Sequence, residues 1–246
     1  MSPYLAEFLG TMIPIILGDG VVANVVLDKT KGNSSGWIVI TAGWGLAVAI
    51  AVYCVGWISG AHINPAVTLG MAAIGELNAS YVPGYLLAQF CGAITGACVV
   101  WLAYLPHWEA TKNQASKLAV FCTAPAIRKP WANMATEIIG TFLLVLGVLA
   151  ILRPDNLNPD AGWNTGLGPL LVGLLVFAIG LSLGGPTGYA INPARDLGPR
   201  IAHHFLPIHG KGDSDWSYAW IPVVGPIIGG VTGALFYQLL WPPVAG

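Results

Sequence analysis

Long apolar stretches separated by short polar segments dominate this chain. A helix needs about 20 mostly apolar residues to cross the hydrocarbon core of a bilayer. Six stretches have roughly this length, and the second, third, fifth and sixth contain no Asp, Glu, Lys or Arg. The fifth is the shortest, and we expect Gly184-Gly185-Pro186 to end it. The predicted spans are Pro3–Leu27, Trp37–Ile58, Val82–Tyr104, Trp131–Leu152, Leu167–Leu183 and Tyr218–Trp241.

Two further apolar stretches are too short to cross a bilayer. One is Ala66–Ile74; the other is Ala194–Phe205, which is broken by Arg195, Asp196 and Arg200. Stretches of this length are typical of re-entrant or interfacial segments. The pattern therefore predicts an all-α membrane protein with six transmembrane helices and two re-entrant half-helices.

Composition supports a membrane protein and excludes several other classes. Charged residues make up 9% of the chain, against about 25% in ordinary globular domains, and hydrophobic residues make up 55%. The net charge is −1 with no basic block, so no nucleic-acid partner is expected. The four cysteines lack metal-ligand spacing and are expected to be free thiols: Cys54, Cys91, Cys98 and Cys122. No cofactor is predicted.

The second half of the chain repeats short motifs of the first. Each half holds three predicted spans, and because three is odd, the second half must enter the membrane from the opposite side. In such inverted repeats, the interrupted segments meet near the bilayer midplane. We therefore predict one channel domain, 1–246, with repeats at roughly 1–105 and 130–246. The motifs recur at offsets of 130, 128 and 137: Ala6–Thr11 with Thr136–Thr141, Ile63–Ala66 with Ile191–Ala194, and Thr95–Ala97 with Thr232–Ala234.

Each predicted half-helix begins with Asn-Pro-Ala, at Asn64 and at Asn192. Asn is a favoured N-cap and Pro a favoured first helical residue. The cap uses the amide oxygen, which leaves the NH₂ group as a donor beside the positive end of a helix dipole. Two such tips at mid-membrane would bind a water or hydroxyl, repel a cation and interrupt a proton wire. A single motif would be interpreted as an ordinary N-cap in a loop; two matched copies favour a pore.

The loops before the two caps are expected to line this pore. Non-helical backbone at membrane depth is tolerated where it is buried in protein or lines a wet cavity. Backbone carbonyls along one wall, with apolar residues opposite, would suit a polyol. The predicted acceptors are the carbonyls of Gly60, Ala61, His62, Gly188, Tyr189 and Ala190.

Four ionisable residues at membrane depth need a role. We expect the repeat-matched Glu7 and Glu137 to accept N–H groups of the two loops; the alternative is a proton-relay acid of a transporter. His62 is expected to support its loop rather than bind a ligand. Arg195, whose counterpart is Val67, is expected to donate to the solute and repel cations, with an ion pair to Asp196 as the alternative.

The segments Ser59–Thr68 and Gly188–Arg200 resemble the paired signatures of the major intrinsic protein (aquaporin) family, and the resemblance runs from Glu7 to the sixth span. Asp196, Arg200 and Pro222 resemble its glycerol-facilitator branch. The resemblance implies a homotetrameric passive channel among the lipids of the cell membrane, with one pore per subunit for glycerol and water. Other candidate solutes are dihydroxyacetone, urea, hydrogen peroxide and undissociated short acids.

The resemblance also assigns a selectivity filter to four residues. Trp44 and Tyr189 would form an aromatic corner for CH groups, and Arg195 would bind hydroxyls. Gly180, which is His in water-selective members, would leave room for a carbon backbone. Tyr189 stands where glycerol facilitators commonly have Phe, which makes this filter more polar.

Other classes of protein fit the pattern less well. A coupled transporter needs a titratable or ion-binding centre, whereas the predicted crossing holds two Asn. A cation channel would use acids or carbonyl rings at its constriction, and an enzyme would need a nucleophile–base pair or a metal cluster.

The family's topology leaves Arg153 as the one cation in the cytoplasmic loops, the reverse of the positive-inside rule. Its other loops would hold Lys29, Lys31, Lys112, Lys117, Arg128, Lys129 and Lys211.

Overall fold

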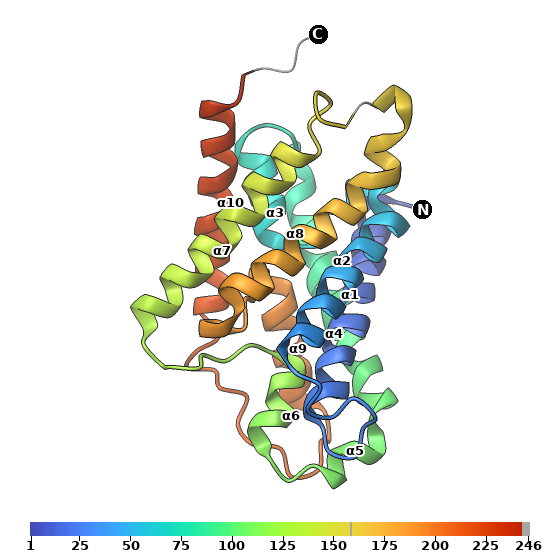
Figure 1. Ribbon diagram of the computed structural model, residues 1–246, viewed down its shortest axis with the longest axis vertical. Helices are drawn as coiled ribbons and strands as arrows, with labels where there is room; N and C mark the ends of the chain where they lie inside the picture. The colour runs from blue at the N-terminus through green and yellow to red at the C-terminus, as the bar shows by residue number, and fades with distance from the viewer. Residues whose placement is uncertain (158, 243–246) are drawn as a thin grey trace.

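The computed structural model describes residues 1–157 and 159–242, and its long helices form one bundle (Figure 1). Within these residues, six helices are long and apolar enough to cross a membrane, as the hydrophobic pattern predicts. Two shorter helices begin at the Asn-Pro-Ala motifs. The long helices are α1 (Pro3–Val26), α2 (Trp37–Ser59), α4 (Val82–Ala103), α7 (Pro130–Ile151), α8 (Trp163–Thr187) and α10 (Ile221–Leu240); the short ones are α3 (Pro65–Ala73) and α9 (Pro193–Phe205).

The connection between the halves contains two helices that the hydrophobic pattern did not predict. They are α5 (Leu105–Ala110) and α6 (Gln114–Phe121), at the lower end of the bundle in Figure 1. Asn113 caps α6 by accepting from the N–H of Ala115 at 2.8 Å. Both helices are shorter than three turns, so their apolar periodicity is too brief to detect in the sequence. Short 3₁₀ turns also occur at η1 (Ala79–Tyr81) and η2 (Pro159–Ala161).

The fifth span is longer than predicted at both ends. Glycines at 184 and 185 and Pro186 do not end it; α8 continues to Thr187 and stops where Gly188 adopts a left-handed φ of 82°. A Cβ on Gly184 would lie 2.6 Å from the Trp37 ring and 2.7 Å from the Tyr189 ring. Packing of two aromatic rings against the helix thus outweighs the roughly 1 kcal/mol helix penalty of glycine.

Glycines of the third and sixth spans allow two close helix contacts, one in each half. A Cβ on Gly92 of α4 would lie 2.2 Å from the carbonyl oxygen of Phe8 in α1. A Cβ on Gly229 of α10 would lie 2.2 Å from the carbonyl oxygen of Ile138 in α7. Small residues at such contacts let membrane helices approach closely. These positions correspond in the repeat, so the two halves are built on the same contact.

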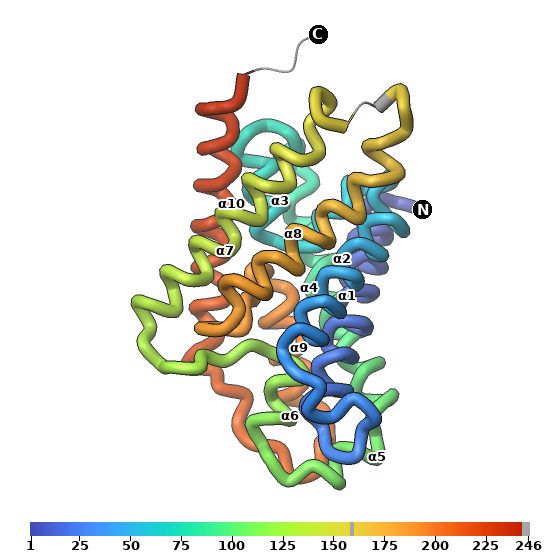
Figure 2. Tube along the Cα trace, in the orientation of Figure 1, coloured from blue at the N-terminus to red at the C-terminus, as the bar shows by residue number. Residues whose placement is uncertain are grey.

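Each half-helix packs against a span of the other half. In α3, a Cβ on Gly70 would lie 2.9 Å from the carbonyl oxygen of Gly230 in α10. In α9, a Cβ on Gly198 would lie 2.6 Å from Cβ of Ala93 in α4. Figure 2 shows α3 above α9. This exchange of half-helices brings the starts of α3 and α9 together in the bundle centre.

Candidate functional site

The two asparagines cap the half-helices as their motif predicts. Asn64 Oδ1 accepts from the N–H of Ala66 at 2.9 Å, and Pro65 is the first residue of α3. Asn192 Oδ1 accepts from the N–H groups of Ala194 at 3.0 Å and Arg195 at 3.2 Å. Each amide oxygen is therefore held by its own helix, and each Nδ2 points away from that helix.

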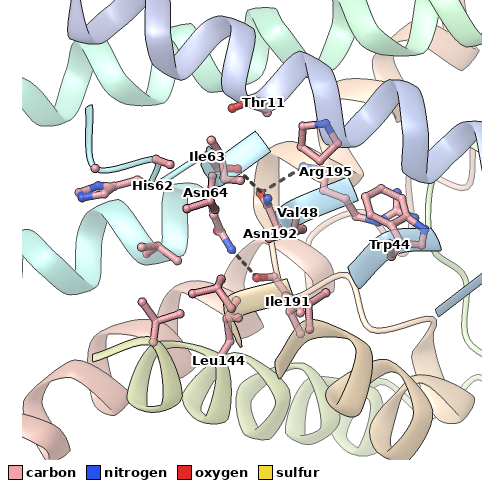
Figure 3. A pocket seen from close by; sticks show the side chains of 18 of the residues that line it. Thr11, Trp44, Val48, His62, Ile63, Asn64, Leu144, Ile191, Asn192 and Arg195 are labelled. Carbon is pink, nitrogen blue, oxygen red and sulfur yellow. Dashed lines mark hydrogen bonds between the residues drawn. The ribbon is translucent and has the colours of Figure 1, made fainter. Parts of the chain in front are cut away.

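The two tips are tied to each other by reciprocal hydrogen bonds (Figure 3). Asn64 Nδ2 donates to the carbonyl of Ile191 at 2.8 Å, and Asn192 Nδ2 donates to the carbonyl of Ile63 at 2.9 Å. From the sequence, both N–H groups of each amide are expected to be free for solute. In the structure, one N–H of each amide donates to the opposite loop. Ile63 and Ile191 were missed, although their place directly before each Asn was the available signal.

The loops before the asparagines have the same unusual backbone in both halves. Ala61 and Ile63 have φ of 46°, and Tyr189 and Ile191 have φ of 41° and 43°. Residues with a side chain seldom adopt this left-handed region, and each costs about 1–3 kcal/mol unless the surroundings enforce it. Five of the six predicted carbonyl residues line the central cavity: Gly60, Ala61, His62, Tyr189 and Ala190, whereas Gly188 does not.

Two buried carboxylates hold these strained loops. Glu7 accepts from the backbone N–H groups of His62 at 2.9 Å and Ile63 at 2.7 Å, and also from Ser59 Oγ at 2.6 Å and Gln89 Nε2 at 2.8 Å. Its side chain is thereby bonded by four donors from three segments of the first half.

Glu137 does the same in the second half. It accepts from the N–H groups of Ala190 at 3.1 Å and Ile191 at 2.9 Å. The loop N–H bonds expected for both acids are thus present. His62 also has the geometry of a loop support, because its Nδ1 lies 3.2 Å from the hydroxyl of Thr68 on α3.

A cavity of about 310 Å³ passes between the two halves. Both asparagines line it, together with residues of the two loops (Figure 3). Trp44, Tyr189 and Arg195 line one part of it, and Glu76 lies beyond the far end of α3. Much of the remaining wall is apolar and comes from α2, α7 and α8: Val48, Val52, Leu144, Val148, Val172 and Val176.

Three of the four residues expected to form a filter meet at this cavity. The guanidinium carbon of Arg195 lies 4.1 Å from the centroid of the Trp44 ring, a cation–π contact. The Tyr189 ring packs edge-on against Trp37, with 5.8 Å between ring centroids. The hydroxyl of Tyr189 is buried and bonds no group of the described residues.

Gly180, the fourth residue predicted for the filter, is not part of the cavity lining. A Cβ added there would lie 2.7 Å from Cζ of Tyr189 and 2.9 Å from Cγ2 of Thr41. Its carbonyl accepts from Trp37 Nε1 at 3.0 Å. The space that Gly180 leaves is therefore filled by the Tyr189 ring, and any room for a solute arises indirectly, from where that ring lies.

Asp196 bonds Arg200 rather than Arg195. Its Oδ1 accepts from Arg200 Nε at 2.9 Å and Nη2 at 2.8 Å, and its Oδ2 accepts from the Thr123 N–H at 2.8 Å. Arg200 also donates to the carbonyl of Ser214 at 2.7 Å. The pair ties α9 to two loops away from the cavity. Pro222, the other branch marker, is a buried residue in the first turn of α10 outside the cavity lining.

Arg195 has an acidic neighbour that sequence analysis did not single out. Asp19 of α1 is fully buried, and its Oδ1 lies 3.4 Å from Arg195 Nη1. The signal was available, since an acid inside an apolar span is unusual and marks a functional candidate.

Several cations at the α5–α6 end are bonded to the loops there. Lys211 Nζ donates to the carbonyls of His203 at 2.6 Å and His204 at 2.7 Å, at the end of α9. Arg128 forms an ion pair with Asp215. Partial burial raises the Asp215 pKa, but the hydrogen bond and charge of Arg128 outweigh it, so this pKa lies below its usual value. The excess of Lys and Arg in the loops at this end of the bundle therefore has a structural role, because these side chains hold the loops in place.

The sequence model of the major intrinsic protein family matches residues 1–237. The chain belongs to this family. A probable glycerol uptake facilitator protein of Thermotoga maritima is 66% identical over 241 residues, covering 98% of this chain and 100% of that one. The glycerol uptake facilitator protein of Bacillus subtilis is 56% identical over 238 residues, covering 97% of this chain and 84% of that one.

A solved structure shows the same fold. The X-ray structure of the aquaglyceroporin from Plasmodium falciparum matches with a TM-score of 0.84 at 31% identity, covering 98% of this chain and 96% of that one. This major intrinsic protein is thus a multi-pass membrane channel with six spans, not an enzyme.

Proposed function

We propose that this major intrinsic protein is a passive channel that conducts glycerol and water down their gradients and excludes protons and ions. Residues 1–246 would act as one domain whose two repeats share a single pore. The observation that carries the proposal is the crossing of Asn64 and Asn192. Each amide keeps a second N–H beside a cavity whose lining combines loop residues, with carbonyls that no described donor bonds, and apolar side chains of the spans.

This arrangement matches the two faces of a polyol. No donor among the described residues bonds the carbonyls of Gly60, Ala61 or His62, so they are free to accept solute hydroxyls. The CH groups of the solute would face the valines and leucines of the opposite wall. Near the midplane, a hydroxyl or water that accepts from both Asn amides has used its acceptor lone pairs, so it cannot accept a proton from a neighbouring water and proton transfer is interrupted. The two helix dipoles add a field that repels cations.

Trp44, Tyr189 and Arg195 would form the narrow selective part of the pore. The proposal assigns CH contacts to the two aromatic rings and hydroxyl binding to the guanidinium. Arg195 Nη1 is bonded within the protein, whereas Nε and Nη2 bond no acceptor of the described residues. Two adjacent donors of this kind suit the neighbouring hydroxyls of glycerol.

Stopped-flow light scattering on proteoliposomes tests the proposal. Imposed glycerol and water gradients should relax faster than in protein-free vesicles, and an imposed proton gradient should leave glycerol flux unchanged. Glycerol flux at the background rate would overturn the glycerol assignment. Flux that follows the proton gradient would instead support a coupled transporter.

The Tyr189 hydroxyl is expected to set the ranking of solutes. Tyr189 lines the cavity and its buried hydroxyl bonds no group of the described residues, so we expect a solute that passes the ring to meet a polar group without a protein partner. Tyr189→Phe should lower urea permeability relative to glycerol about threefold, since urea loses a polar contact worth about 0.7 kcal/mol, within the range of a neutral hydrogen bond. The same vesicle assay measures both solutes. An unchanged ratio would show that the hydroxyl does not contact the solute.

Dihydroxyacetone, hydrogen peroxide and undissociated short acids present the same small neutral donors and acceptors and are further candidate solutes. We also propose a homotetramer, as the family resemblance implies, with membrane lipid around it. Light scattering of the purified protein in detergent, corrected for bound detergent, measures the subunit number.

A further inference from the structure

Asp19 and Arg195 are the two positions at which the halves differ in buried charge at the filter. At the repeat offset of 130, Asp19 corresponds to Leu149, and at the offset of 128, Arg195 corresponds to Val67. The filter region therefore departs from the repeat at both positions, once with an acid and once with a base. The other buried charges of α9, Asp196 and Arg200, also lack charged counterparts but bond each other away from the cavity. The two side chains lie in contact, with Asp19 Oδ1 3.4 Å from Arg195 Nη1.

Helix α1 passes directly behind the filter and contacts both of its stacked side chains. A Cβ on Gly18 would lie 2.4 Å from the Trp44 ring, so the absence of a side chain lets the ring lie against α1. The next residue, Asp19, reaches the guanidinium that covers Trp44 (Figure 3 shows the stacked pair). Asp19 itself does not line the cavity. It is thus placed to act on the solute through Arg195.

The charges around Arg195 leave Asp19 as its counter-ion. Asp196 is bonded by Arg200 and by Thr123, and Glu137 is bonded by loop N–H groups. The side chain of Asp19 is 0% exposed, and its Oδ2 has no partner among the described residues. A buried carboxylate is tolerated only when an opposite charge or donors compensate it. Arg195 is the one cation that bonds it in the described part of the chain.

We propose that Asp19 is a positioning residue that fixes Arg195 and neutralises its charge, so that the filter presents hydrogen-bond donors without attracting anions. Nη1 is bonded to Asp19 and, at 3.2 Å, to the carbonyl of Phe121. Binding Nη1 sets the plane of the guanidinium and leaves Nε and Nη2 as the donors for solute. This inference rests on the proposed function, because it assigns Arg195 to the filter.

The test compares five proteins in proteoliposomes: the wild type, Asp19→Asn, Arg195→Gln, the double variant, and Asp28→Asn as a control. Asp28 is an exposed acid just beyond the end of α1, so its substitution makes the same chemical change away from the filter. Glycerol and water permeability are measured by light scattering, and chloride entry by a trapped chloride-sensitive dye.

Asp19→Asn should lower the glycerol-to-water permeability ratio about fivefold, the factor for losing about one hydrogen bond to the solute. It should also raise chloride entry above the wild-type rate, which a purely structural role of Asp19 would not do. Asp28→Asn should change neither. In the Arg195→Gln background, Asp19→Asn should have no further effect on the ratio or on chloride entry, because it acts through the arginine.

Three results would overturn the proposal: wild-type behaviour of Asp19→Asn, chloride entry that stays at the wild-type rate while the ratio falls, or equal effects of Asp19→Asn in both backgrounds. Should Asp19→Asn not yield folded protein, recovery of folding in the double variant supports the pair, and failure of both contradicts it. A wild type without glycerol flux would sink the proposed function alone, because the chloride measurement still tests Asp19.

Discussion

Gly180→His should lower glycerol permeability at least about tenfold while changing water permeability about twofold. The Cβ alone would lie 2.7 Å from the Tyr189 ring, so the ring must move from its place beside Gly180 toward the cavity. Overpacking of this kind costs about 1–3 kcal/mol, and 1.4 kcal/mol of added barrier corresponds to a tenfold change in rate. A displaced ring obstructs a carbon backbone more than it obstructs a single water. Paired glycerol and water measurements in proteoliposomes give the two permeabilities.

Two further glycine variants make this result specific. Gly180→Ala adds only the Cβ and should have a smaller effect in the same direction. Gly185→Ala is the matched control, because a Cβ at this position of the same helix meets nothing within 4 Å. Equal losses of glycerol and water flux in Gly180→His would mean that Tyr189 does not border the selective part of the pore.

Glu7→Leu should destabilise the protein by at least about 3 kcal/mol and close the pore. The substitution leaves two backbone N–H groups without an acceptor, together with Ser59 and Gln89. Each buried donor left unpaired costs about 1–3 kcal/mol. Without the carboxylate, the left-handed conformation of Ile63 loses its support, and the carbonyl that receives Asn192 moves with it. Thermal unfolding in detergent and glycerol flux measure the two consequences.

A fall in the unfolding temperature of about 10 °C corresponds to this free energy for a chain of this size. Glu7→Gln keeps one oxygen acceptor and should fall between Glu7→Leu and the wild type. Glu109→Leu changes an exposed acid of α5 and should leave the unfolding temperature unchanged. If Glu7→Leu unfolds at the wild-type temperature, the loop is held by other contacts.

The sequence by itself determined the number of spans, the inverted repeat and the starts of the half-helices. These features depend on local properties. The length of an apolar stretch is measured against a bilayer of known thickness, and Asn-Pro favours a helix start through the properties of its own two residues. The loop hydrogen bonds of Glu7 and Glu137 could be expected because the repeat places both acids in matched positions.

Only the tertiary structure decided how the residues at the pore are used. It assigned one amide N–H of Asn64 to a carbonyl 127 residues away, filled the space at Gly180 with Tyr189, and paired Arg195 with Asp19 across 176 residues. It also extended α8 through two glycines and a proline, where two aromatic rings pack against the helix. Such contacts depend on how the two halves dock. A local pattern of residues does not encode which side chains from distant parts of the chain come into contact.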